Sequence, residues 1–132
     1  GHPNQVAPRK RPFHTIIPGF LLREGQAVGP FGVMGGYMQA QGHMQMVINT
    51  VDYGMNPQAS LDAPRWRWDG DRAVTIEPDA DPSVVAGLRA RGHDVVVGSD
   101  QAFGRGQIIW KLPGGGYVAG SDKRADGCAA AY

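Results

Sequence analysis

Residues 32–54 read GVMGGYMQAQGHMQMVINTVDYG, in which two adjacent glycines stand directly before a helical pattern. The apolar side chains that follow recur at intervals of three and four residues, which places them along one face of a helix. This pattern predicts a helix from about 39 to 53, ended by Gly54. Its apolar stripe consists of Met44, Val47, Ile48, Val51 and Met55.

Short strand patterns flank this helix on both sides. Residues 13–17 and 20–22, a turn at 23–26 and the apolar stretch 27–33 predict two short paired strands before it. After it, strands are expected at 65–71, 73–77, 93–97, 107–112 and 117–119, the last two as a hairpin. The tail at 120–127 is polar and is expected to be irregular.

Two short helices complete the expected elements. Asn56-Pro57 and Asp81-Pro82 each place a capping side chain before a proline at the first helical position. The first of these helices must finish before Pro64, and the second ends at Gly92. About three helices among these strands predict an ordered, loop-rich domain of the α/β or α+β class.

Length and charge exclude several classes of protein. A chain of 132 residues suits one compact domain and is too short for a second of full size. Its formal net charge of +1 provides no field that would gather nucleic acid or anionic lipid. No apolar run approaches the roughly 20 residues of a membrane-spanning helix, and the start shows no signal-peptide pattern. We therefore expect no nucleic-acid partner and no membrane partner.

The histidines and the single cysteine do not indicate a metal site. The four histidines are far apart and lack the ligand spacing that zinc sites show. Cys128 cannot form an internal disulfide, and no neighbouring base would activate its thiol. We expect a small buried residue at this position, and neither a metal nor a cofactor.

Two short stretches are candidates for a binding site. The backbone N–H groups of Gly35 and Gly36, at the start of the helix, could hold a phosphate, a carboxylate or a developing oxyanion. A tight turn would need glycine for its own backbone reasons. His14 beside Thr15 could present polar groups to a ligand, but on sequence alone ordinary strand alternation is the favoured explanation of the pair.

Two charged stretches have simpler explanations. The arginines and tryptophans at 65–68 resemble a single-strand nucleic-acid site, but in a nearly neutral protein a half-buried strand explains them better. Asp122 and Asp126 flank Lys123 and Arg124, which predicts a salt-bridged turn without catalysis.

A collinear series of short motifs runs from near residue 9 to the end of the chain. It comprises Lys10-Arg11-Pro12, Gly32-x-x-Gly35-Gly36, residues 45–54, Ala63-Pro64-Arg65, Glu77, Gly92-His93 and Ser121-Asp122-x-Arg124-x-Asp126-Gly127. In this order and spacing the motifs resemble the C-terminal part of the small subunit of the gamma-glutamyltranspeptidases. That family consists of N-terminal-nucleophile (Ntn) hydrolases.

The resemblance implies a fold and a set of site residues. The fold is an α+β sandwich of two β-sheets, with mostly antiparallel strands, between helix layers, to which residues 1–132 contribute a single domain with an extended entry segment at 1–12. Gly35 and Gly36 fall at the family's oxyanion hole. His14 and Thr15 occupy the places where many members have two serines that hold the substrate's α-carboxylate.

The resemblance also implies partners and an activity. The substrate would be a γ-glutamyl amide such as glutathione, or a related acyl amide, because His14 departs from the family pattern. The catalytic threonine would precede Gly1, so that the remainder of a parent enzyme is the main partner and this chain alone is inactive.

Two further expectations concern assembly. The apolar helical stripe from Met44 to Val51, deprived of a packing partner, would favour self-association as a symmetric dimer. The alternative to an enzyme fragment is a free-standing, non-catalytic domain of the same fold that binds a ligand or a partner. The length of the native open reading frame would distinguish the two.

Overall fold

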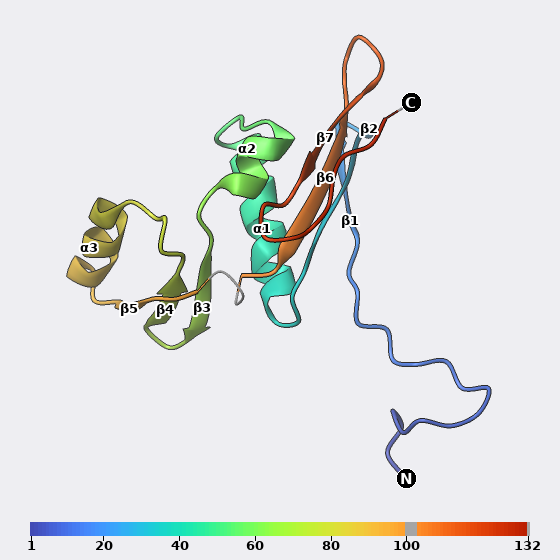
Figure 1. Cartoon of the computed structure of the whole chain (residues 1–132), viewed down its shortest axis with the longest axis horizontal. Helices are drawn as coiled ribbons and strands as arrows, with labels where there is room; N and C mark the ends of the chain where they lie inside the picture. The colour runs from blue at the N-terminus through green and yellow to red at the C-terminus, as the bar shows by residue number, and fades with distance from the viewer. Residues whose placement is uncertain (100–102, 132) are drawn as a thin grey trace.

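The structure, a computed structural model, describes residues 1–99 and 103–131 and contains two sheets and three helices in that part of the chain (Figure 1). The strands are β1 (Gly19–Arg23), β2 (Gln26–Met34), β3 (Trp66–Gly70), β4 (Ala73–Ile76), β5 (Asp94–Val97), β6 (Arg105–Lys111) and β7 (Tyr117–Ser121). The helices are α1 (Met38–Val51), α2 (Pro57–Asp62) and α3 (Pro82–Ala90). The predicted α+β class is confirmed.

The larger sheet is antiparallel, with the strand order β1-β2-β6-β7. Glu24 and Gly25 join β1 to β2 with φ values of 50° and 77°, the positive pair that a two-residue hairpin turn requires. The predicted turn at 23–26 is therefore confirmed. The predicted strand at 13–17 is wrong: this stretch lies exposed between Pro12 and Pro18, without regular structure, and β1 begins only at Gly19.

Helices α1 and α2 cover one face of this larger sheet (Figure 1). The core between them contains Val33, Met46, Leu61, Ile108 and Trp110. A Cβ on Gly42 would lie 2.8 Å from Cγ1 of Val33, so glycine at this position lets α1 approach β2 closely.

The face of α1 that packs differs from the predicted one. The helix buries Met38, Gly42, Gln45 and Met46, while Met44 and Val51 of the predicted stripe are exposed. Close backbone approach at Gly42 and hydrogen bonds from Gln45 determine this orientation, and neither contributes to an apolar pattern in the sequence.

The smaller sheet combines the antiparallel pair β3-β4 with the parallel pair β4-β5. Helix α3 connects β4 to β5 and packs Val85 against Ile76 and Val95. Both predicted helix caps are confirmed: Asn56 accepts a hydrogen bond of 2.9 Å from N of Ala59, and Asp81 accepts one of 2.8 Å from N of Ser83.

Two glutamines of α1 attach the edge strand β3 to the helix. The side-chain amide of Gln45 donates to O of Trp66 and accepts from its N, at 2.8 and 3.1 Å. One turn earlier, Gln41 makes the same pair of hydrogen bonds to Trp68, at 3.1 and 2.7 Å. Residues one helical turn apart therefore bind alternate residues of a strand and satisfy edge groups that would otherwise need another strand.

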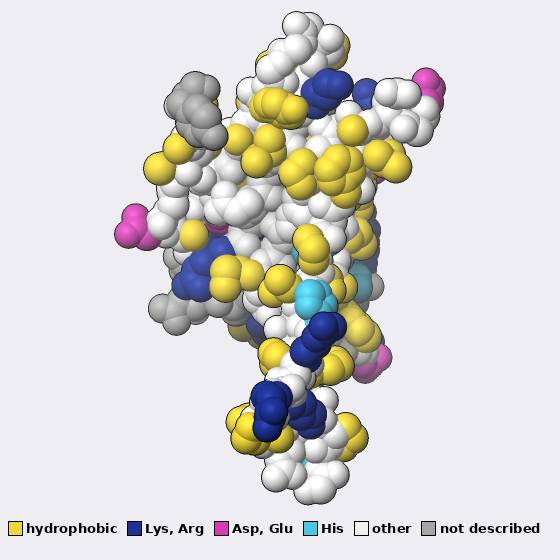
Figure 2. All heavy atoms as spheres, turned by 90° about the vertical axis from the view of Figure 1, so that its right-hand side faces the viewer, with side chains coloured by type: hydrophobic (Ala, Val, Ile, Leu, Met, Phe, Trp, Pro, Cys, Tyr) yellow, Lys and Arg dark blue, Asp and Glu magenta, His cyan; other side chains and the backbone are white. Residues whose placement is uncertain are grey.

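The opposite face of the larger sheet carries many exposed apolar side chains. Figure 2 shows them gathered on the side of the molecule where β1 lies. They include Phe20, Leu22, Met34, Ile109 and Tyr117. Among the described residues no helix has the length and apolar character needed to cross a bilayer.

Candidate active site

The glycine pair forms the turn between β2 and α1. Gly35 has a φ of 142° and Gly36 a φ of 58°, values that side-chain-bearing residues rarely adopt. Their carbonyl oxygens accept hydrogen bonds of 3.1 Å from N of Met38 and from N of Gln39. Their own N–H groups make no hydrogen bond within the described part of the chain. Two backbone donors thus remain available at the start of a 14-residue helix that has no acidic residue in its first turn.

The two glycines have different surroundings. A Cβ on Gly35 would lie 2.8 Å from Cα of Gly104, so glycine is required there for space as well as for φ. Gly104 itself has a φ of 72°, and a Cβ on it would collide with the carbonyl oxygen of Met34. Apart from its two chain neighbours, no heavy atom of the described residues lies within 4 Å of the position that a Cβ on Gly36 would occupy. The turn is therefore packed on one side and open on the other.

A hollow of about 510 Å³ adjoins the open side of the turn. Its lining comes from the start of α1 and from β3: Gly35, Gly36, Tyr37, Met38, Gln41, Arg67, Trp68 and Asp69. The charged groups in this lining pair with each other, since Nε of Arg67 lies 2.5 Å from a carboxylate oxygen of Asp69. A hydrogen bond from Thr75 and the Arg67 guanidinium together hold the pKa of Asp69 below its ordinary value. The hollow consequently combines free backbone donors with a neutral, partly aromatic wall.

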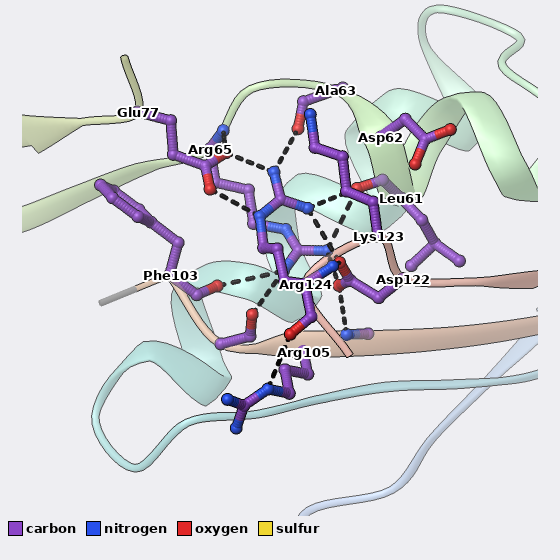
Figure 3. Close-up of polar contacts among 12 residues, drawn as sticks. Leu61, Asp62, Ala63, Arg65, Glu77, Phe103, Arg105, Asp122, Lys123 and Arg124 are labelled. Atoms are coloured by element: carbon purple, nitrogen blue, oxygen red, sulfur yellow. Dashed lines mark hydrogen bonds and ion pairs between the residues drawn. The ribbon is translucent and has the colours of Figure 1, made fainter. Parts of the chain in front are cut away.

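A buried network of charged groups lies behind the packed side of the turn (Figure 3). Asp122, which is 1% exposed, accepts hydrogen bonds from Nη2 of Arg65 at 2.6 Å and from N of Gly106 at 2.5 Å. It also accepts from N and Nη1 of Arg124, at 2.9 and 3.0 Å. Burial opposes ionisation of Asp122, yet these donors and the charge of Arg65 hold its pKa below the ordinary range.

Glu77 completes the network from the end of β4. Its carboxylate accepts hydrogen bonds from Nε of Arg124 at 2.5 Å and from N of Arg65 at 2.7 Å, and a further one from Nη2 of Arg124. Burial would lower the pKa of Arg124, but the hydrogen bonds and charges of Glu77 and Asp122 raise it. Burial lowers the pKa of Arg65, with the charge of Asp122 opposing the change. Each charge is held by a partner of the opposite sign.

Arg65 connects this network to the glycine turn. Its Nη1 donates hydrogen bonds of 3.1 Å to O of Phe103 and to O of Gly104. Gly104 is the residue against which Gly35 packs. The network therefore supports the turn through a single intermediate segment of backbone.

The structure does not unite all of the predicted site residues. His14 and Thr15 are exposed and do not line the hollow. Their stretch is attached near the turn by one hydrogen bond, 2.9 Å from Nε2 of Gln39 to the carbonyl oxygen of Thr15. The expectation that Cys128 is buried is wrong, because the irregular tail leaves it exposed. No group of three or more His, Cys, Asp or Glu residues placed to hold a metal occurs in residues 1–99 and 103–131.

Sequence reasoning missed two parts of the site. The sequence predicts a half-buried structural strand at 65–68, but in the structure Trp68 lines the hollow. The predicted salt bridge between Asp122 and Arg124 is confirmed, but its links to Arg65 and Glu77 were not anticipated. Ala63-Pro64-Arg65 and Glu77 stand among the family motifs, and that grouping could have suggested that they meet.

Comparisons of sequence identify relatives along the whole chain. Residues 1–132 match the family model described as gamma-glutamyltranspeptidase. The glutathione hydrolase-like YwrD proenzyme of Bacillus subtilis is 31% identical over 97% of this chain and 26% of its own length. The oxamate amidohydrolase proenzyme of Klebsiella pneumoniae is 33% identical over 96% of this chain and 25% of its own. The chain thus spans about a quarter of these curated relatives.

Solved structures give the same fold. A structure described as cephalosporin acylase from Bacillus halodurans superposes with a TM-score of 0.85 and 53% identity, over 96% of this chain and 24% of that one. A mutant gamma-glutamyltranspeptidase from Pseudomonas nitroreducens gives a TM-score of 0.78 at 20% identity, over 100% of this chain and 69% of that one. The second likeness is one of fold alone, and together the two confirm the predicted Ntn-hydrolase type.

Proposed function

The chain belongs to the gamma-glutamyltranspeptidase family, and we propose that it is the part of an amide-cleaving acyl-transfer enzyme that supplies the oxyanion hole. The observation that carries this proposal is the pair of free backbone N–H groups at Gly35 and Gly36, beside an open hollow. Donors fixed in this way stabilise charge without reorganising during the reaction. Their support through Gly104 and Arg65 keeps the turn in place.

The proposed reaction proceeds through an acyl-enzyme. The hydroxyl of a threonine in the remainder of the parent enzyme attacks the acyl carbon of an amide, and its own α-amino group takes the proton. The carbonyl oxygen becomes an oxyanion that accepts hydrogen bonds from N of Gly35 and N of Gly36. Collapse of this intermediate breaks the C–N bond, the α-ammonium group of the threonine returns its proton to the departing nitrogen, and the neutral amine leaves. Water or the amine of an amino acid then attacks the ester and restores the threonine.

We propose an acyl amide, rather than strictly a γ-glutamyl amide, as the substrate. The identity of 53% to a structure described as a cephalosporin acylase supports this choice, as does 33% identity to an oxamate amidohydrolase. His14 and Thr15, in the places where the family resemblance puts two serines, support it as well. Glutathione and other γ-glutamyl compounds then become weaker substrates than amides that lack the α-amino and α-carboxylate groups.

Three anilides test this function and its specificity. The parent enzyme is assayed on γ-glutamyl-, glutaryl- and butyryl-p-nitroanilide, which carry successively fewer charged groups on the same acyl chain. We expect a kcat/KM for glutaryl- or butyryl-p-nitroanilide at least equal to that for the γ-glutamyl compound. Efficient turnover of the γ-glutamyl anilide alone would refute the acyl specificity, and no turnover of any of the three would refute the enzymatic function.

The isolated 132-residue chain provides a second test. We expect no hydrolysis, because the nucleophile is supplied by the remainder of the parent. Hydrolysis by the purified chain that is abolished by a substitution within it would contradict this division of roles. We also propose that the isolated chain, as one domain, self-associates through apolar surface such as Met44 and Val51, which are 41% and 49% exposed. A monomeric mass in light scattering at high micromolar concentration would contradict self-association.

A further inference from the structure

We propose that the hollow beside the glycine turn binds a planar aromatic group of the substrate against the indole ring of Trp68, which makes Trp68 a specificity-determining residue. This inference rests on the proposed function, because it takes the carbonyl of the substrate to lie at Gly35 and Gly36. The same two glycines line the hollow together with Trp68. A group bound there would therefore be attached to the reacting amide directly or through a short link.

Trp68 is held in place at its backbone and at its ring. Its N and O both pair with the side-chain amide of Gln41, which itself lines the hollow. Its indole Nε1 donates a hydrogen bond of 3.0 Å to O of Asp71. The residue nevertheless remains 54% exposed. With its N–H satisfied, the ring offers a preorganised apolar surface on which another ring can stack.

The charges around the hollow favour a neutral ligand. Arg67 and Asp69 pair with each other, and Asp69 also accepts a hydrogen bond of 2.5 Å from the hydroxyl of Thr75. The remaining side chains that line the hollow, Tyr37, Met38, Gln41 and Trp68, carry no formal charge. An ionised carboxylate or ammonium group of a substrate would find no unpaired charged side chain in this lining, and the N–H groups of Gly35 and Gly36 are occupied by the reacting carbonyl in the proposed function. The hollow, of about 510 Å³, is within the size range of small-molecule sites.

Trp66 provides a matched control on the same strand. It makes the same pair of backbone hydrogen bonds, with Gln45 in place of Gln41, and is 36% exposed. It does not line the hollow. A substitution of Trp66 therefore removes an exposed indole from β3 and leaves the proposed platform intact.

The test is a binding measurement on the 132-residue chain with two neutral probes. Acetanilide carries its phenyl ring on the amine side of the amide, and phenylacetamide carries it on the acyl side. N-methylacetamide is the control without a ring. Two-dimensional ¹H–¹⁵N spectra follow the backbone N–H groups of Gly35 and Gly36 and the indole N–H of Trp68 during titration.

We expect at least one phenyl probe to shift these three signals, while N-methylacetamide at equal concentration does not. The Kd should rise about tenfold in Trp68→Ala, equivalent to ~1.4 kcal/mol of stacking, and stay within about twofold in Trp68→Phe and Trp66→Ala. The probe that binds identifies the side of the amide that enters the hollow. Shifts elsewhere in the wild-type chain, no binding of either phenyl probe, or an unchanged Kd in Trp68→Ala would overturn the proposal.

This measurement separates the inference from the proposed function. Binding to the wild-type chain needs no catalytic threonine and no turnover, and it requires no variant to fold. If the parent enzyme cleaves the anilides and neither phenyl probe binds at Trp68, the aromatic platform is refuted and the enzymatic function stands. If a phenyl probe binds as expected and the parent cleaves no amide, the enzymatic function is refuted and the binding site stands.

Discussion

The two sides of the Gly35–Gly36 turn are built in opposite ways. Behind Gly35 lie Gly104 and the ionic network of Arg65, Glu77, Asp122 and Arg124, whose charged groups are paired and buried. In front of Gly36 is open space, and N–H groups without acceptors among the described residues lie beside a hollow. Among the described residues, each charged side chain of the network has a partner of opposite sign, while the N–H groups of Gly35 and Gly36 have no acceptor.

The largest loss of stability is expected when the buried ionic network behind Gly35 is disrupted. Asp122→Ala should lower the free energy of unfolding by about 3–5 kcal/mol, because it leaves Arg65 buried without its carboxylate partner. Urea denaturation followed by circular dichroism measures the change. The control is Asp79→Ala, whose pair with Lys123 is about half exposed and should cost only about 0–1 kcal/mol. Equal losses in the two variants would show that burial of the network contributes nothing.

The glycine pair tests the boundary between the two sides. Gly35→Ala should cost about 3 kcal/mol, since its Cβ would meet Cα of Gly104 at 2.8 Å in addition to the strain of its φ. Gly36→Ala suffers only the strain of a φ of 58° and should cost about 1 kcal/mol. Thermal unfolding of the two variants compares these costs. The contrast fails if Gly36→Ala proves as destabilising as Gly35→Ala.

The glutamine pair on α1 sharpens the comparison further. Gln45 is 6% exposed, so Gln45→Ala leaves two backbone groups of Trp66 unpaired near the interior and should cost about 2 kcal/mol. Gln41→Ala frees the corresponding groups of Trp68 closer to solvent and should cost less than half as much. Denaturation midpoints of the two variants provide the measurement, and a larger loss in Gln41→Ala would contradict it.

The smallest change in the free energy of unfolding is expected when the pH is lowered into the mildly acidic range. The pKa of Asp122 is lower in the folded chain than the ordinary aspartate value of about 3.9, so its ionisation stabilises the fold above that value. This contribution disappears as the pH falls through the lower, folded pKa. The difference in unfolding free energy between the wild type and Asp122→Asn should therefore be constant above about pH 5 and narrow below about pH 4. If the difference between the wild type and Asp122→Asn instead widens in acid, the pKa of Asp122 is raised by folding and not lowered.

Local chemistry in the sequence predicted the features that depend on neighbouring residues. The caps at Asn56 and Asp81, the hairpin turn at Glu24-Gly25 and the glycine turn before α1 are each determined within a few residues. The prediction of a strand failed where residues that favour strands have no neighbouring strand to pair with. Residues 13–17 have β-forming side chains, but the strand that pairs with β2 begins only at Gly19.

Features that depend on distant residues could not be derived from pattern alone. Contact with Val33 and hydrogen bonds to the edge of β3 determine which face of α1 is buried. The buried face therefore contains Gly42 and Gln45, and it is not the most apolar face of the helix. Cys128 was expected to be buried because cysteine commonly is, yet no element packs over the tail that contains it. The hollow could not be predicted from the sequence, because it forms only where β3 lies beside the start of α1.

The ionic network also has a consequence for the order of folding. Arg65 and Asp122 are 57 residues apart in sequence, and Glu77 and Arg124 are 47 apart. Closing loops of this length costs entropy before the charges can meet, and a ribosome delivers residues 122–124 after both of their partners. Until then Arg65 and Glu77 must remain hydrated. The glycine turn is synthesised before residues 122–124 and thus acquires its buried support only after those residues have been delivered.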